Sequence, residues 1–221
     1  MIRRAPRDLA HGEEVAVEVG QLRLAGHLVV PPGALGIVVF VHGSGSSRHS
    51  PRNRSVAAEL NRRSIGTLLF DLLTPDEELD RANVFDIELL ARRLEAVTLW
   101  LRTEPGVGTL PFGYFGASTG AGAALWAAAS ADADVVAVVS RGGRPDLALP
   151  RLAAVRAPTL LIVGGRDLQV LELNRAAEAA LRCERRLTVV PGATHLFEEP
   201  GALDEVARLA GDWFVAHLST G

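Results

Sequence analysis

Three residue types that together perform acyl transfer each follow an apolar run in this 221-residue sequence. Ser118 lies in Gly-Ala-Ser-Thr-Gly, Asp167 in Gly-Gly-Arg-Asp and His195 in Gly-Ala-Thr-His. A serine hydroxyl is a poor nucleophile until a base removes its proton, and histidine can do so near neutral pH. A carboxylate fixes the tautomer of that histidine and stabilises the imidazolium. The pattern predicts a catalytic triad with Ser118 as nucleophile, His195 as general base and Asp167 as orienting acid.

The Gly-x-Ser-x-Gly segment lies between a predicted strand, 112–117, and an Ala/Gly/Leu-rich stretch with high helix propensity. Strand, tight turn and helix form the context of a nucleophile elbow, where the residues around the serine must be small. The pattern alone is weak, because a chain this rich in glycine contains one by chance in about one case in ten. The alternative is a glycine-softened turn, so the rest of the chain must supply the base and the acid.

The acid and the base also have simpler interpretations. Asp167 could cap the helix that follows it, and His195 could be an ordinary loop histidine. Asp71 also follows a predicted strand, but it precedes Ser118 in the chain. Because Ser118, Asp167 and His195 each lie past their own strand in the order nucleophile, acid, histidine, we expect these three to form the triad.

Acyl transfer also needs hydrogen-bond donors aimed at the oxyanion that develops on the substrate. The backbone N–H of Thr119, directly after the nucleophile, is one expected donor. The second is the backbone N–H of Ser44, in the His-Gly-Ser-Gly turn that follows the predicted strand 36–41. The alternative for this turn is an ordinary Gly/Ser loop.

A basic segment, 48–54, follows the same turn and is expected to be a loop. Its arginines could receive an acidic group of a substrate. The favoured alternative is that they pair with carboxylates such as Asp146 or Asp71, because arginine commonly locks loops in this way. The candidate substrate-binding residues are Arg48, His49, Arg52 and Arg144.

Apolar runs alternate with stretches of helical periodicity along the whole chain. Residues 14–19 and 22–30 are expected to form an antiparallel pair at a sheet edge. The other expected strands are 36–41, 65–70, 112–117, 135–139, 159–163 and 187–190, and the expected helices are 55–63, 84–102, 171–182 and 203–218. This alternation predicts an α/β fold with a mostly parallel twisted sheet and helices on both faces. The irregular segments 72–83 and 140–158 are too short or too polar for a cap domain, so an open site is expected.

The composition sets broader limits. A length of 221 residues with 48% hydrophobic content suits a single domain over 1–221. The net charge of −3 argues against a nucleic-acid partner, and the single cysteine, Cys183, against a disulfide framework. No metal and no cofactor are expected. The basic segment 1–10 lacks the apolar run of a signal peptide, and no stretch is long enough to span a membrane. We expect a cytoplasmic monomer or small homo-oligomer.

The four Gly-containing motifs together resemble those of the α/β-hydrolase superfamily, over nearly the whole chain. Within it, the small size and the Gly-Ala-Thr-His segment resemble the dienelactone-hydrolase-like group. The namesakes of that group use a cysteine nucleophile, whereas Ser118 stands at the matching position and Cys183 is expected on a helix. This departure argues against dienelactone hydrolysis itself and favours a serine carboxylesterase. The basic segment also resembles small hydrolases that occur alone or fused to phosphoribosyltransferase-like domains.

The expected reaction is therefore the hydrolysis of small soluble carboxylic esters through an acyl-enzyme. Two alternatives remain open: a thioesterase or amidase that uses the same triad, and a non-catalytic binding module that keeps the fold. Dehalogenase and epoxide hydrolase chemistry is disfavoured, because those α/β-hydrolases carry aspartate where Ser118 stands.

Overall fold

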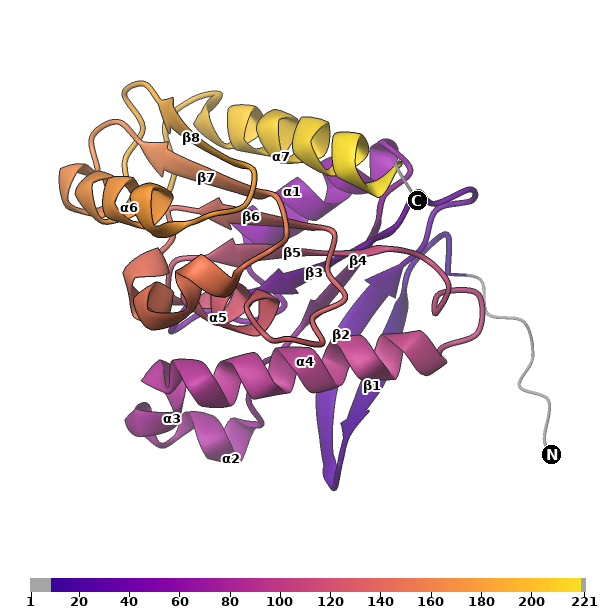
Figure 1. The fold of residues 1–221 in the computed structure, drawn as a ribbon. Helices are drawn as coiled ribbons and strands as arrows, with labels where there is room; N and C mark the ends of the chain where they lie inside the picture. Colours follow the sequence, from indigo (N-terminus) through magenta and orange to yellow (C-terminus); the bar gives the residue numbers. More distant parts are fainter. Residues whose placement is uncertain (1–8, 220–221) are drawn as a thin grey trace, which may run out of the picture.

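The computed structural model describes residues 9–219, in which eight strands form one sheet in the order β1-β2-β4-β3-β5-β6-β7-β8 (Figure 1). β1 and β2 pair antiparallel, as do β2 and β4, and all other neighbours are parallel. The strands are β1 (Glu13–Val19), β2 (Leu22–Val29), β3 (Ile37–Val41), β4 (Gly66–Phe70), β5 (Phe112–Ala117), β6 (Ala137–Arg141), β7 (Thr159–Gly164) and β8 (Arg185–Val190). The predicted edge pair and mostly parallel sheet are confirmed.

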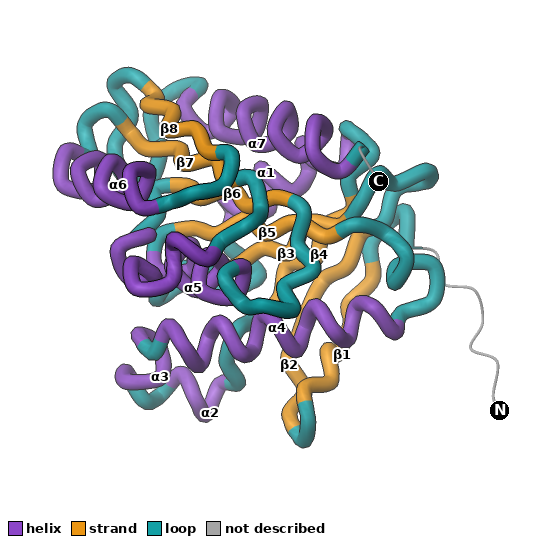
Figure 2. Tube along the Cα trace, viewed as in Figure 1, coloured by secondary structure: helices purple, strands orange, loops and turns teal. Residues whose placement is uncertain are grey.

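Helices cover both faces of the sheet, as Figure 2 shows. The helices are α1 (Pro51–Arg62), α2 (Pro75–Glu78), α3 (Arg81–Phe85), α4 (Ile87–Thr103), α5 (Thr119–Ala128), the 3₁₀ helix η1 (Pro145–Ala154), α6 (Leu168–Ala180) and α7 (Ala202–Leu218). α1 and α7 pack together on one face, whereas α4, α5 and η1 pack on the other. The two faces therefore carry separate hydrophobic cores, and the strands β3 to β7 between them are buried on both sides, whereas β1, β2 and β8 at the edges are partly exposed.

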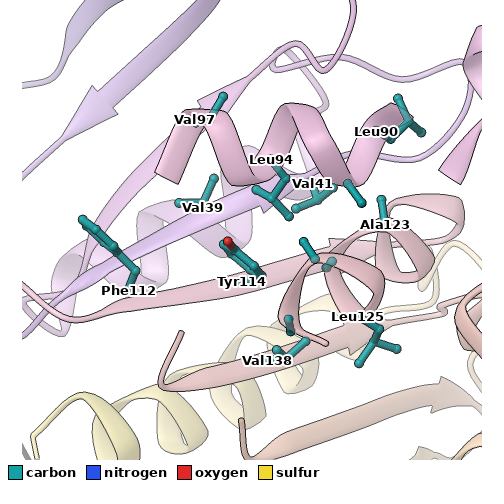
Figure 3. Close-up of a cluster of buried hydrophobic side chains, with 14 of the residues drawn as sticks. Val39, Val41, Leu90, Leu94, Val97, Phe112, Tyr114, Ala123, Leu125 and Val138 are labelled. Atoms are coloured by element: carbon teal, nitrogen blue, oxygen red, sulfur yellow. The ribbon is translucent and has the colours of Figure 1, made fainter. Parts of the chain in front are cut away.

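The core beneath α4 and α5 shows how strand and helix periods combine (Figure 3). α4 turns Leu90, Leu94 and Val97 toward the sheet, at the spacing of one helix face. β3 and β5 contribute alternate residues, such as Val39 and Tyr114, to this core. The intervening residues of each strand face α1 and α7. Each strand thus contributes to both cores, which is why the central strands are continuous apolar runs.

Three sequence expectations need correction. The segment 48–54 is not all loop, because α1 begins at Pro51 with Ser50 as its N-cap. A Ser-Pro pair is a helix start signal, since proline suits the first helical position. Residues 72–83 are not irregular, because Thr74 and Glu77 form a capping box that starts α2, and α3 follows. Cys183 lies in the turn between α6 and β8 rather than on a helix.

The described residues contain no cap domain: the segment 140–158, which was expected to be irregular, contains the 3₁₀ helix η1 as its only helix. None of the helices within residues 9–219 is both long and apolar enough to cross a membrane. The expectation of no signal peptide concerns residues 1–10. Residues 1–8 of that segment lie outside the described residues.

The burial of α4 leads to a stability prediction. Leu94 is 0% exposed and Leu99, on the outer face of the same helix, is 68% exposed. We expect Leu94→Ala to lower the free energy of unfolding by about 2–5 kcal/mol, because it removes buried methyl groups and leaves a cavity. Leu99→Ala should change it by about 0.5 kcal/mol or less. Urea unfolding of both variants measures the difference, and equal losses would contradict the packing described.

Candidate active site

The centre of the sheet contains the point where the strand order reverses. β3 lies between β4 and β5: the chain passes from β3 to β4 on one side, and then builds β5 to β8 on the other. In open α/β sheets, the carboxyl ends of the strands at such a switch point flank the ligand crevice. The Ser44 turn follows β3 and Ser118 follows β5, so both lie at this point.

The backbone at Ser118 has the geometry of a nucleophile elbow. Ser118 lies between β5 and α5 with a φ of 51°, in the left-handed region that favours glycine. A Cβ on Gly120 would lie 2.2 Å from the carbonyl oxygen of Val41, and one on Gly116 would lie 2.4 Å from the Cα of Ala121. Both glycines are thus required by close backbone approach, as the sequence pattern suggested.

Asp167 and His195 are joined by a hydrogen bond of 2.6 Å between Nδ1 of the histidine and Oδ2 of the aspartate. Asp167 occupies the N-cap position of α6, but its side chain makes no capping hydrogen bond. The carboxylate therefore binds the histidine instead of the helix, which sets aside the capping interpretation. Asp71 is engaged elsewhere, because it accepts a hydrogen bond from the backbone of Arg48.

The His195 ring lies beside the elbow. The N–H of Ser118 donates to the carbonyl of Arg141 at 3.3 Å, and a Cβ on the next residue, Gly142, would lie 3.6 Å from Cε1 of His195. Within residues 9–219, Ser118 Oγ makes no hydrogen bond to His195 Nε2. Contacts between a nucleophile and its base are often long in the free protein and tighten when substrate binds.

The two expected oxyanion donors belong to residues that touch each other. The N–H of Ser44 donates to Oγ1 of Thr119 at 2.9 Å. The adjacent Gly43 lies against Ser118, since a Cβ there would be 3.7 Å from Ser118 Oγ. The Thr119 hydroxyl thus holds Ser44 in position next to Ser118. A substrate oxyanion would have to replace that hydroxyl as the acceptor of the Ser44 N–H.

The side chain of His42 links the Ser44 turn to the rest of the protein through two hydrogen bonds. Its Nε2 accepts a hydrogen bond of 3.2 Å from the N–H of Leu72, so Nδ1 carries the ring proton and donates to the carbonyl of Gly43 at 3.0 Å. This buried, neutral imidazole links the turn after β3 to the segment after β4. The sequence motif predicts His42 in the turn, but it contains no signal for this link, which joins segments about 30 residues apart.

The expected substrate-binding arginines are mostly engaged with carboxylates. Arg48 pairs with Asp71, the partner suggested by the alternative interpretation. Arg144 forms two hydrogen bonds of 2.8 Å to Asp146, and these raise the pKa of Arg144 above its usual value.

The two remaining candidates lie in different surroundings. Arg52 reaches the exposed Glu198 at 3.4 Å. His49 is exposed and lines a cavity of about 270 Å³ with Glu14 and His27, and none of the three expected triad residues lines that cavity.

Arg141 was not recognised from the sequence. The expected strand ended at residue 139, whereas β6 continues to Arg141 and buries its side chain. A buried charge at a strand end leaves no local signal in the sequence, because polar residues there usually mark the start of a loop.

A second cavity, of about 360 Å³, opens at the Ser44 turn. Gly43 and Ser44 form one wall, next to Ser118. Apolar side chains from the segment after β4 and from α3 and α4 form the other: Leu72, Leu73, Val84 and Leu90. The segment 72–83, which appeared too acidic to cover a site, thus places two leucines on the wall of this cavity.

Comparison with known proteins identifies the family, although no family model matches the chain. The structure matches a dienelactone hydrolase from Anabaena variabilis with a TM-score of 0.89 and 56% identity, over 93% of this chain and 98% of that one. The chain therefore belongs to the dienelactone-hydrolase-like group of the α/β-hydrolase superfamily. Est1E from Butyrivibrio proteoclasticus, 14% identical, shares the fold with a TM-score of 0.80 over 94% of this chain and 99% of that one.

Curated proteins from two strains of Mycobacterium tuberculosis are 66% identical over 206 residues, which is 93% of this chain. Both carry the provisional name phosphoribosyl transferase. The chain spans 46% of their length, so the proteins that carry this name are about twice as long as this chain.

The hydrogen bond between Asp167 and His195 generates a prediction. Asp167→Asn should lower kcat for ester hydrolysis by about 10⁴-fold, because the amide no longer holds the required tautomer of His195. The control is Asp71→Asn, which keeps an acceptor for the Arg48 N–H and should retain activity within a few-fold. Steady-state assays of both variants give the answer. A benign Asp167→Asn with a crippling Asp71→Asn would show that the acid has been misassigned.

Proposed function

We propose that this chain is a serine hydrolase that cleaves small soluble carboxylic esters through an acyl-enzyme, with Ser118, His195 and Asp167 as its triad. The observation that carries the proposal is the left-handed backbone of Ser118 at the end of β5, with φ of 51°. A non-glycine residue in this region is strained, and such strain is typical of functional sites. The pairing of Asp167 with His195 beside it supplies the remaining groups.

The reaction follows from these groups. Ser118 Oγ attacks the ester carbonyl while Nε2 of His195 takes the serine proton. Asp167 stabilises the imidazolium, and the N–H groups of Thr119 and Ser44 stabilise the oxyanion. His195 then protonates the leaving alcohol as the C–O bond breaks. A water molecule, deprotonated by His195, releases the acid and restores Ser118.

The cavity at the Ser44 turn sets the expected acyl length. Its wall of Leu72, Leu73, Val84 and Leu90 can take the apolar part of a short acyl group. Beyond it, a longer chain would lie in water, and each exposed methylene would forfeit about 0.8 kcal/mol. We therefore expect activity on acetate to about hexanoate esters, without interfacial activation.

We assign the phosphoribosyl transferase name of the curated relatives to the part of those proteins that this chain does not cover. The chain matches 46% of their length, and the 206 matched residues make up 93% of this chain, which has the hydrolase fold. The proposal for this chain is therefore a hydrolase activity.

The nucleophile is tested by covalent labelling. Reaction with p-nitrophenyl acetate should place an acetyl group on Ser118, detected by mass spectrometry of the peptide. Ser118→Ala should lose turnover and labelling while keeping its fold, measured by circular dichroism. Cys183→Ala should keep both the turnover and the labelling of Ser118. Burial raises the pKa of the Cys183 thiol and so disfavours its reactive thiolate.

The possible outcomes separate the candidate functions. Faster turnover of acyl thioesters than of matched oxygen esters would indicate a thioesterase. A protein with an intact fold that neither labels at Ser118 nor hydrolyses any ester would contradict the proposal and favour a binding module.

A larger side chain in the cavity at the Ser44 turn tests whether the acyl group binds there. Val84→Phe should lower kcat/KM for p-nitrophenyl hexanoate about tenfold relative to the acetate ester, because the larger ring occupies the space for the acyl chain. Leu79→Phe adds bulk to the same segment at a position that is 86% exposed, and should leave the ratio unchanged. An unaltered ratio in Val84→Phe would show that the acyl chain lies elsewhere.

A further inference from the structure

A short segment at the end of β6, residues 141–144, holds the backbone of Ser118 through two hydrogen bonds. The N–H of Ser118 donates to the carbonyl of Arg141 at 3.3 Å, and the N–H of Arg144 donates to the carbonyl of Ser118 at 3.0 Å. A left-handed backbone such as that of Ser118 persists only where its surroundings fix it. The segment 141–144 therefore helps to set the direction in which the Ser118 hydroxyl points.

The same segment contacts His195. A Cβ on Gly142 would lie 3.1 Å from the carbonyl oxygen of His195 and 3.6 Å from Cε1 of its ring. Residues 141–144 thus touch both Ser118 and His195. A displacement of this segment would change the distance between Ser118 Oγ and His195 Nε2.

A buried side chain from another element holds this segment in place. Asn174, on α6, is 0% exposed, and its Nδ2 donates to the carbonyl of Gly143 at 3.0 Å and to that of Val170 at 2.8 Å. Gly143 is buried too, and within residues 9–219 no other group donates to its carbonyl. Because α6 begins directly after Asp167, Asn174 connects the helix of the expected acid to the segment that contacts the other two triad residues.

Asparagine lowers the stability of the protein at this position. Within residues 9–219, Oδ1 of Asn174 is buried without a hydrogen-bond partner. Buried polar atoms are nearly always paired, and an unpaired one is costly. A leucine, which has the same number of side-chain heavy atoms, would avoid this cost and favour the helix. Only the amide, however, supplies a donor to Gly143, and stability given up in this way is typical of functional sites.

We propose that Asn174 is a positioning residue of the candidate active site. Its amide fixes the carbonyl of Gly143, and the segment 141–144 transmits this constraint to Ser118 and His195. The inference rests on the proposed ester hydrolysis and adds to it a residue that touches neither the substrate nor the reacting atoms. A small shift is sufficient for a large effect, because reacting groups displaced by about 1 Å lose about 10²-fold in rate.

Removal of the amide tests this role. Asn174→Leu keeps the side-chain size, and Asn174→Ala serves if leucine does not fit. Each should lower kcat for p-nitrophenyl acetate by about 10- to 100-fold, because Ser118 and His195 are no longer aligned. KM should change by less than about threefold, since none of the residues of α6 lines the cavity at the Ser44 turn. The melting temperature of Asn174→Leu should change little, because the loss of one hydrogen bond is offset by removal of an unpaired oxygen.

Two matched controls lie close to Asn174. Ser140 Oγ is buried against the same segment, where a Cβ on Gly143 would collide with it, and it has no hydrogen-bond partner within residues 9–219. Ser140→Ala should therefore keep kcat and the melting temperature, or raise the latter. Val170, one turn earlier on α6, packs in a small apolar cluster. Val170→Ala should lower the melting temperature but keep kcat when assayed well below it.

Amide hydrogen exchange gives a measurement that needs no turnover. The N–H groups of Ser118 and Arg144 are the two that bind the segment 141–144 to the elbow. Their exchange should become about tenfold faster in Asn174→Leu, because the segment opens more often, and should stay unchanged in Ser140→Ala.

The outcomes separate this inference from the proposed reaction. If exchange at Ser118 and Arg144 accelerates as expected but the unaltered protein hydrolyses no ester, Asn174 positions the elbow and the esterase proposal fails. If the unaltered protein hydrolyses esters and Asn174→Leu and Asn174→Ala keep kcat, the positioning role is refuted. It is also refuted if Val170→Ala loses as much kcat as the Asn174 variants, because the loss then follows the stability of α6.

Discussion

The close approach of helix α5 to the ends of β3 and β5 is the contact on which the candidate site depends. Gly120 lies so near the carbonyl oxygens of Val41 and His42 that no side chain fits between them. This contact places the start of α5 directly against the turn after β3, so that Thr119 can hold Ser44. Ser118 and both expected oxyanion donors therefore lie together because two backbones meet without side chains between them.

The sequence was most informative where local pattern and tertiary structure agree. The strand 112–117 was predicted with the bounds that the structure gives, because a continuous apolar run ends at a glycine elbow. The helix α1 was placed too late, because the arginines of its first turn suggested a loop and outweighed the Ser-Pro start signal. The α2–α3 segment was misread because its capping box was overlooked among its acidic residues.

Long-range partners explain the remaining differences. The bond between Asp167 and His195 could be anticipated from chain order, because both residues follow parallel strands that end at one edge. The links from His42 to Leu72 and from Ser44 to Thr119 could not, because each joins segments that only the folded chain brings together. Arg141 is the extreme case: its burial depends on α1 and on the loop before α7, and neither is near it in the sequence.

The backbone conformation of Ser118 affects which substitutions can accumulate at this position during evolution. Its left-handed conformation costs about 1–3 kcal/mol for a residue with a side chain and almost nothing for glycine. The folded state would thus gain stability from Ser118→Gly, while the hydroxyl of the proposed nucleophile would be lost. This position is one at which stability and activity oppose each other. A lineage released from the need for the hydroxyl would drift toward glycine here, so a retained serine in a relative indicates an elbow that is still in use.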